Sequence, residues 1–152
     1  ISKYISRIIA HETSSKDSSN FSSFFKICSN LERIGDHAMN ICEYTRMMEE
    51  KQIIFSKEAK KEIQNMQEIS LKALDHLYNL DSMSEERLAE AADIEQQIDQ
   101  MTEEYRQNQM ERMRLETCEG EASILYSEML TDFERIGDHS LNIAQELATI
   151  RA

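Results

Sequence analysis

Apolar residues recur at spacings of three and four along this chain, a pattern typical of amphipathic helices that bury one face. The most regular seam predicts a helix from Phe21 to about Met48. Its apolar residues stand at positions 24, 27, 31, 34, 38, 41 and 48, with Thr45 in the remaining place. Residues 1–13 have the apolar face of a helix tail, and further seams predict helices over 57–79, 85–115 and 121–149.

Short polar segments separate these helices. Residues 13–20 read Thr-Ser-Ser-Lys-Asp-Ser-Ser-Asn, which is rich in turn and capping residues, so we expect a turn there. Connections are also expected at residues 51–56, 81–84 and 117–121. Ser56 and Ser84 precede helical seams and are predicted N-caps, because a serine hydroxyl accepts a hydrogen bond from a free amide of the first turn.

A phrase of eleven residues occurs twice in the chain. Residues 31–41 read Leu-Glu-Arg-Ile-Gly-Asp-His-Ala-Met-Asn-Ile, and residues 133–143 read Phe-Glu-Arg-Ile-Gly-Asp-His-Ser-Leu-Asn-Ile. Eight of the eleven positions are identical, at a constant offset of 102 residues. Such identity is very unlikely by chance in so short a chain, so we interpret it as an internal duplication.

The order of the predicted helices indicates an all-α fold. Three consecutive long helices joined by short turns form an antiparallel three-helix bundle, which we place at residues 57–150. The remnant of a second, duplicated bundle precedes it. We therefore divide the chain into a truncated first repeat, residues 1–50, and a complete second repeat, residues 51–152. A lone amphipathic helix does not keep its seam exposed to water, so the helix from Phe21 should pack on the intact bundle or on a second chain.

Composition and charge narrow the choice of partners. The 152 residues include no proline and three glycines, which favours long helices. A net charge of −12 disfavours nucleic acids and anionic membrane surfaces, because both repel an acidic body. No apolar run reaches the roughly 20 residues that span a bilayer, and no signal peptide is visible. The chain begins at Ile1 inside a helical pattern, and we expect it to be part of a longer one.

The three cysteines give no sign of a disulfide framework. Cys28, Cys42 and Cys118 are widely spaced and form no Cys-x-x-Cys pair. They are interpreted as buried or incidental thiols in a reducing compartment. We therefore expect a cytoplasmic protein.

Each copy of the duplicated phrase holds two carboxylates four residues apart, Glu32 with Asp36 and Glu134 with Asp138. Residues at this spacing share one face of a helix, and the seam register places that face away from the core. Two like charges at this spacing cost an isolated helix about 0.2–0.5 kcal/mol. A bound cation would offset that cost.

A third pair of carboxylates, Glu95 and Asp99, lies beside the predicted core positions Ile94 and Ile98. If its helix neighbours the last one, four carboxylates converge on the bundle surface. Carboxylate clusters bind hard or borderline divalent and trivalent cations, with iron or zinc among the candidates. The alternative is that these pairs bind no metal, because carboxylates at this spacing are common on acidic helices. The candidate metal ligands are Glu134, Asp138, Glu95, Asp99, Glu32 and Asp36.

Two residue types within the phrase leave alternatives open. Gly35 and Gly137 lie in mid-helix, where glycine costs about 1 kcal/mol relative to alanine. Either a neighbouring helix approaches closely, or a bound cation needs room beside the backbone. His37 and His139 follow the acids directly, as possible additional ligands or as hydrogen-bonding residues at a helix contact.

No catalytic constellation accompanies the acids. The chain lacks Gly-x-Ser-x-Gly, a P-loop and His-Glu-x-x-His, and it lacks the Glu-x-x-His of di-iron oxidases. We therefore expect that it is not an enzyme. A carboxylate–metal hydrolase is the remaining enzymatic hypothesis.

The phrase Glu-Arg-Ile-Gly-Asp-His-x-x-Asn-Ile, placed twice on the third helix of a bundle, resembles the PhoU family. The resemblance covers nearly the whole chain and starts inside the second helix of the first repeat. It implies six helices in two bundles, with surface metal clusters held by Glu/Asp-x-x-x-Asp motifs. The acids that would complete the first cluster fall upstream of Ile1. The implied ligands are Glu32, Asp36, Glu134 and Asp138, with Glu95 and Asp99 as the acids of the preceding helix.

PhoU-like domains occur in two settings, which imply different partners. One is a stand-alone regulator of phosphate uptake that acts on the phosphate transporter and its sensor kinase. The other is the cytosolic tail of a sodium-dependent phosphate cotransporter, at the inner face of the membrane. The serine-rich start and the position of the second phrase favour the tail; the regulator and a purely structural module without metal are the alternatives. The expected partners are a phosphate transporter or the membrane portion of the same chain, and a second copy in a homodimer, with no nucleic acid.

Overall fold

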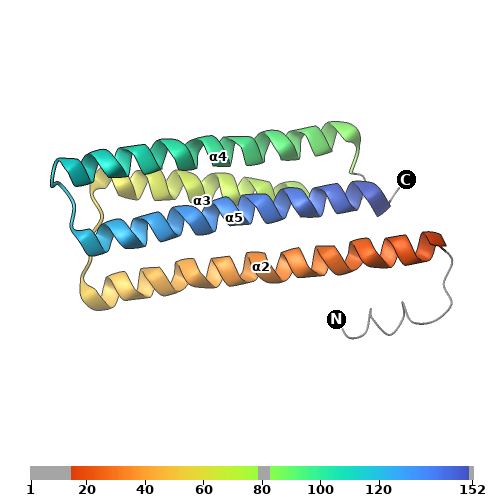
Figure 1. Ribbon diagram of the computed structural model, residues 1–152, viewed down its shortest axis with the longest axis horizontal. Coiled ribbons are helices and arrows are strands. Elements are labelled where there is room, and N and C mark those ends of the chain that lie inside the picture. Colours follow the sequence, from red (N-terminus) through yellow and green to blue (C-terminus); the bar gives the residue numbers. More distant parts are fainter. Residues whose placement is uncertain (1–14, 79–82, 151–152) are drawn as a thin grey trace.

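The computed structural model describes residues 15–78 and 83–150, and this part of the chain folds into helices without strands. The fold is therefore all-α, as the seams predict. Figure 1 shows the helices as long rods lying side by side. Their bounds are Ser15–Lys51 for α2, Lys57–Tyr78 for α3, Glu85–Arg114 for α4 and Gly120–Ile150 for α5.

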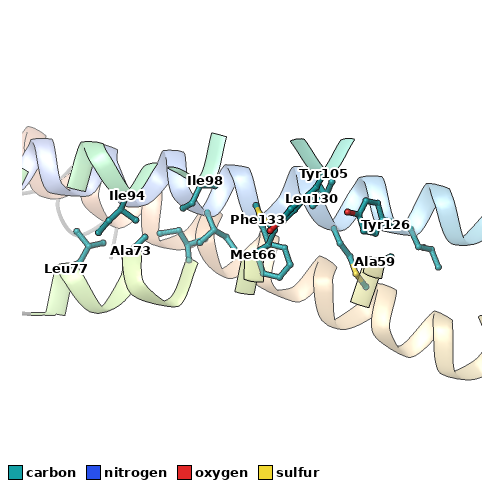
Figure 2. Close-up of a cluster of buried hydrophobic side chains, with 14 of the residues drawn as sticks. Ala59, Met66, Ala73, Leu77, Ile94, Ile98, Tyr105, Tyr126, Leu130 and Phe133 are labelled. Atoms are coloured by element: carbon teal, nitrogen blue, oxygen red, sulfur yellow. The ribbon is translucent and has the colours of Figure 1, made fainter. Parts of the chain in front are cut away.

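Helices α3, α4 and α5 pack against one another as an antiparallel three-helix bundle. Each end of these helices lies within two residues of the predicted bound. The bundle core consists of apolar side chains from all three helices (Figure 2). The side chains of Met66, Ile98, Tyr126 and Leu130 are fully buried there.

Serine caps start two of the helices, as predicted. The Ser56 hydroxyl accepts a hydrogen bond from the amide of Ala59 at 3.1 Å. The Ser84 hydroxyl accepts one from the amide of Arg87 at 3.2 Å. Each cap satisfies an amide that has no partner within its own helix.

Helix α2 runs antiparallel to α5 and packs along its length (Figure 1). An ion pair joins the helices near each end of the contact, Lys26 with Glu146 and Lys51 with Glu121. The expectation that this helix packs on the intact bundle is confirmed. None of the described helices contains an apolar stretch of the length that a membrane-spanning helix needs.

Two predictions about α2 were wrong in detail. The turn expected at residues 13–20 is helical from Ser15 onward, and its first two residues lie outside the described part. Serine, aspartate and asparagine cost a helix well under 1 kcal/mol each, so a long helix extends through them. The predicted apolar seam is also only partly buried. Ile34 is buried and Ile27 and Ile41 pack on the core, whereas Phe24 and Leu31 stay exposed, because among the described helices only α5 packs against α2.

Candidate metal centre

Three carboxylates from two helices meet on the outer surface of the bundle. Glu95 and Asp99 lie on α4, and Asp138 lies on α5. One oxygen from each lies within 4.8 Å of the other two. Glu95 and Asp138 are partly buried, and Asp99 is exposed.

A glycine on α5 lets α4 come close enough to form this cluster. An added Cβ at Gly137 would lie 2.8 Å from Cδ1 and 3.3 Å from Cγ2 of Ile98, a fully buried side chain. Asp99 follows Ile98 and Asp138 follows Gly137, so the close approach of the two helices also brings their acids together. Of the two explanations for this glycine, close approach of a helix is the one that the structure supports.

The three carboxylates repel one another. Burial raises the pKa of Glu95, and the charges of Asp99 and Asp138 raise it further. Burial also raises the pKa of Asp99, with additional repulsion from Asp138 and Glu134. Such shifts reflect burial first, together with negative charge that the neighbouring cations do not balance.

The fourth expected carboxylate, Glu134, is not part of the group of three. Its Oε2 atom accepts a hydrogen bond from Nη2 of Arg106 at 2.7 Å. Asp138 has an ion pair of its own, with Nη1 of Arg135 at 2.9 Å. The structure thus brings three of the four carboxylates together, while an arginine from α4 takes the fourth.

The donor set fits a hard cation. All three groups offer oxygen, which calcium, magnesium and manganese prefer. A cation with oxygen ligands at about 2.3–2.6 Å can touch oxygens that lie up to about 5 Å apart. The separations in this cluster are within that limit. Glu95, Asp99 and Asp138 would hold the ion, whose charge would neutralise their repulsion and tie α4 to α5.

The first copy of the phrase has a different setting. Glu32 and Asp36 are exposed on α2, and within the described residues they belong to no group of three possible ligands. Gly35 has no atom of the described residues within 4 Å of an added Cβ, so none of the described helices covers it. The described helices therefore supply α2 with no counterpart of α4 and its acids.

The phrase histidines lie at the contact between α2 and α5. His37 Nδ1 is 2.6 Å from Oδ1 of Asp132, and His139 Nδ1 is 2.9 Å from Oδ1 of Asn30. The two rings stack with centroids 5.5 Å apart. Burial lowers the pKa of His139, and the nearby His37 lowers it further. Both histidines thus hydrogen-bond across a helix contact, which is the second of the two sequence-based alternatives.

Two buried carboxylates were missed by sequence reasoning. Asp132 accepts hydrogen bonds from His37 and Asn40, and its Oδ2 atom has no hydrogen-bond partner among the residues that the structure describes. Glu62 pairs with Arg112 at 2.7 Å inside the bundle. Glu62 also accepts hydrogen bonds from the side chains of Asn108 and Tyr126. The sequence holds no local sign of either site, because every partner comes from another helix.

Comparisons with known proteins agree with the duplicated phrase. A family model described as the PhoU domain matches residues 1–45 and 63–147. A curated relative from Thermotoga maritima, "Phosphate-specific transport system accessory protein PhoU homolog 1", is 32% identical over 131 residues. The alignment covers 82% of this chain and 53% of the relative, so the chain spans about half of that protein's length. No solved structure matches the chain.

Proposed function

Because the chain belongs to the PhoU domain family, we propose that it regulates phosphate uptake by binding to a phosphate transport system rather than by catalysis. The main support is the similarity to a protein named as an accessory of the phosphate-specific transport system. On this proposal the protein works in the cytoplasm, at the inner face of the membrane. Residues 51–152 act as one complete repeat and residues 1–50 as the end of another.

The regulator is better supported than the tail of a sodium-dependent cotransporter, which the serine-rich start had favoured. The curated relative is named as an accessory protein, and its alignment covers most of this chain. Nothing in the comparisons names a sodium-dependent transporter. The stand-alone regulator therefore replaces the tail as the proposed function.

The proposed cofactor is a cation held by Glu95, Asp99 and Asp138. The supporting observation is that three oxygens from separate positions on two helices lie within 4.8 Å of one another. The pKa values of Glu95 and Asp99 are raised by burial and, further, by the charges of neighbouring carboxylates, a repulsion that a cation would relieve. When bound, the ion would supply positive charge and a cross-link between α4 and α5.

Two measurements test this proposal separately. Cation binding is measured by titration calorimetry with Mn²⁺ and by elemental analysis of the purified chain. Asp138→Asn should weaken binding at least tenfold. Asp93→Asn, which removes an equal charge from an exposed position of α4 outside the cluster, should leave it unchanged. Equal binding by both variants would exclude this centre.

The regulatory role is tested in cells that lack their own PhoU protein. Expression of the chain should lower the output of a phosphate-starvation reporter when phosphate is plentiful. Unchanged output with a stably folded, well-expressed chain would contradict the regulatory proposal. If the chain regulates but binds no cation, the regulatory proposal stands and the proposed cofactor is excluded.

A further inference from the structure

An arginine of α4 lies beside the candidate metal centre and holds the fourth carboxylate apart from the other three. Nη2 of Arg106 donates to Oε2 of Glu134 at 2.7 Å and to Oγ1 of Thr131 at 3.2 Å. The Thr131 hydroxyl donates its own proton to the backbone oxygen of Ser127 at 3.0 Å, so it acts as an acceptor toward Arg106. Two side chains of α5 therefore fix the position of this guanidinium.

Glu134 lies between Arg106 and the three clustered carboxylates. Because α4 and α5 are antiparallel (Figure 1), Arg106 and Glu134 lie on the same side of the cluster. Glu134 is about one helical turn from Asp138, and Arg106 is about two turns from Asp99. Burial and the charge of Asp138 raise the pKa of Asp99; the charge of Glu134 raises it further and that of Arg106 lowers it. Both members of the ion pair thus act on the cluster.

The ion pair between Arg106 and Glu134 is weak enough to be exchanged for a metal ligand. The two side chains are 40% and 26% exposed. Ion pairs that remain in contact with water contribute little to stability, because hydration offsets their attraction. Glu134 and Asp138 share one face of α5, so a different rotamer of Glu134 would carry its carboxylate from Arg106 toward the cluster.

We propose that Arg106 determines how the centre binds its cation, by holding Glu134 away and limiting the centre to three carboxylates. This inference rests on the cation centre proposed above. The charges support it, because Arg106 pairs with Glu134 and Arg135 pairs with Asp138. Four carboxylates and two arginines leave a net charge of −2, which one divalent ion neutralises. Without Arg106, the site would gain both a negative charge and a free carboxylate.

Titration calorimetry with Mn²⁺ tests the role of Arg106. Arg106→Gln should bind Mn²⁺ about tenfold more tightly than the unmodified chain, because Glu134 becomes a ligand. The gain should disappear in the double variant Arg106→Gln/Glu134→Gln, which loses both members of the pair and keeps the same net charge. Arg114→Gln is the control for a lost positive charge. Arg114 is an exposed arginine of α4 that pairs with Glu111 outside the cluster, and its replacement should leave Mn²⁺ affinity unchanged.

Two further measurements distinguish a bound carboxylate from a nearby charge. At about 1 M ionic strength the Debye length is about 3 Å, so the effects of charges across solvent are largely screened. The tighter binding of Arg106→Gln should persist there if Glu134 contacts the ion. Proton relaxation of water by the bound Mn²⁺ reports its water ligands. Arg106→Gln should hold fewer waters on the ion than the unmodified chain, because the Glu134 carboxylate replaces them.

The possible results separate this inference from the proposed centre. If the gain survives Glu134→Gln, vanishes in high salt or leaves the water ligands unchanged, Arg106 acts only through its charge and the inference is wrong. If Asp138→Asn weakens Mn²⁺ binding but Arg106→Gln leaves it unchanged, the inference is wrong and the centre stands. If neither the unmodified chain nor Arg106→Gln binds Mn²⁺, both are wrong. Circular dichroism confirms that each variant is folded.

Discussion

His37 on α2 lies 2.6 Å from the buried carboxylate of Asp132 on α5, and the duplication repeats this contact in reverse. Asn30 is the counterpart of Asp132 at the offset of 102, and it lies 2.9 Å from His139. The two copies of the phrase therefore contact each other as two identical subunits would. A carboxylate or amide oxygen can only accept, so the histidine ring donates in both contacts.

Replacement of Asp132 tests the strength of this contact. Asp132→Ala leaves His37 and Asn40 without their acceptor in a partly buried interface. We expect the free energy of unfolding to fall by about 1–3 kcal/mol, the usual cost of stranding buried polar groups. Asp132→Asn keeps an acceptor oxygen and should lose less, because asparagine already has this role at position 30. Urea denaturation measures both, and equal losses would contradict the assignment.

The two phrase glycines should respond oppositely to alanine. Gly35→Ala adds a methyl group to open space and should stabilise the chain by up to about 1 kcal/mol, the difference in helix propensity. Gly137→Ala has the same gain in helix propensity, but it forces the buried Ile98 to move, and overpacking costs about 1–3 kcal/mol. We expect a net loss of up to about 2 kcal/mol. Urea denaturation of the two variants makes the comparison. Stabilisation by both alanines would argue against close packing at Gly137.

The acidic cluster should destabilise the cation-free protein at neutral pH. The pKa of Glu95 is raised in the folded state, so its ionised form is disfavoured there and the cost grows as pH rises through that pKa. Glu95→Gln should therefore raise the Tm in EDTA at pH 7. The gain should disappear below about pH 4.3, the unfolded pKa of a glutamate, where both states are protonated.

Addition of a cation should make the unmodified chain more stable than the Glu95→Gln variant. Mn²⁺ should raise the Tm of the unmodified chain, since a ligand that binds only the folded state stabilises it. The Glu95→Gln variant should gain less. Glu90→Gln, at an exposed position of α4 outside the cluster, is the control for a lost charge. An equal response from all three proteins would show that the cation binds elsewhere.

Glu62 should make an important contribution to the stability of the bundle. Burial alone would raise its pKa, but hydrogen bonds from Arg112, Tyr126 and Asn108 outweigh burial and lower it. Removing one partner of a buried pair costs about 3–5 kcal/mol, so Glu62→Ala should destabilise strongly. Glu58→Ala, at an exposed position of the same helix, should change little.

The pH dependence of this pair has a defined sign. Because the folded pKa of Glu62 is lowered, its contribution is complete above the unfolded pKa of about 4.3 and is lost as pH falls through the lowered value. The unmodified chain should therefore lose stability on acidification more steeply than Glu62→Gln does. Parallel curves from pH 7 to pH 2 would show that the pair does not contribute in this way.

The helices, their order and the duplication could be read from the sequence, because periodicity and capping are local properties. The bounds of α3, α4 and α5 lie within two residues of those predicted. The outward position of Asp138 followed from the same register. Local spacing also identified Glu95 and Asp99 as its possible partners.

Only tertiary packing decided how the surroundings of the two copies of the phrase differ. Gly137 packs against a neighbouring helix and Gly35 does not, although their sequence neighbours match. Glu134 pairs with Arg106 instead of joining Asp138, and Asp132 and Glu62 are buried with partners from other helices. Each of these outcomes depends on side chains that are distant in the sequence and come into contact only when the helices pack together.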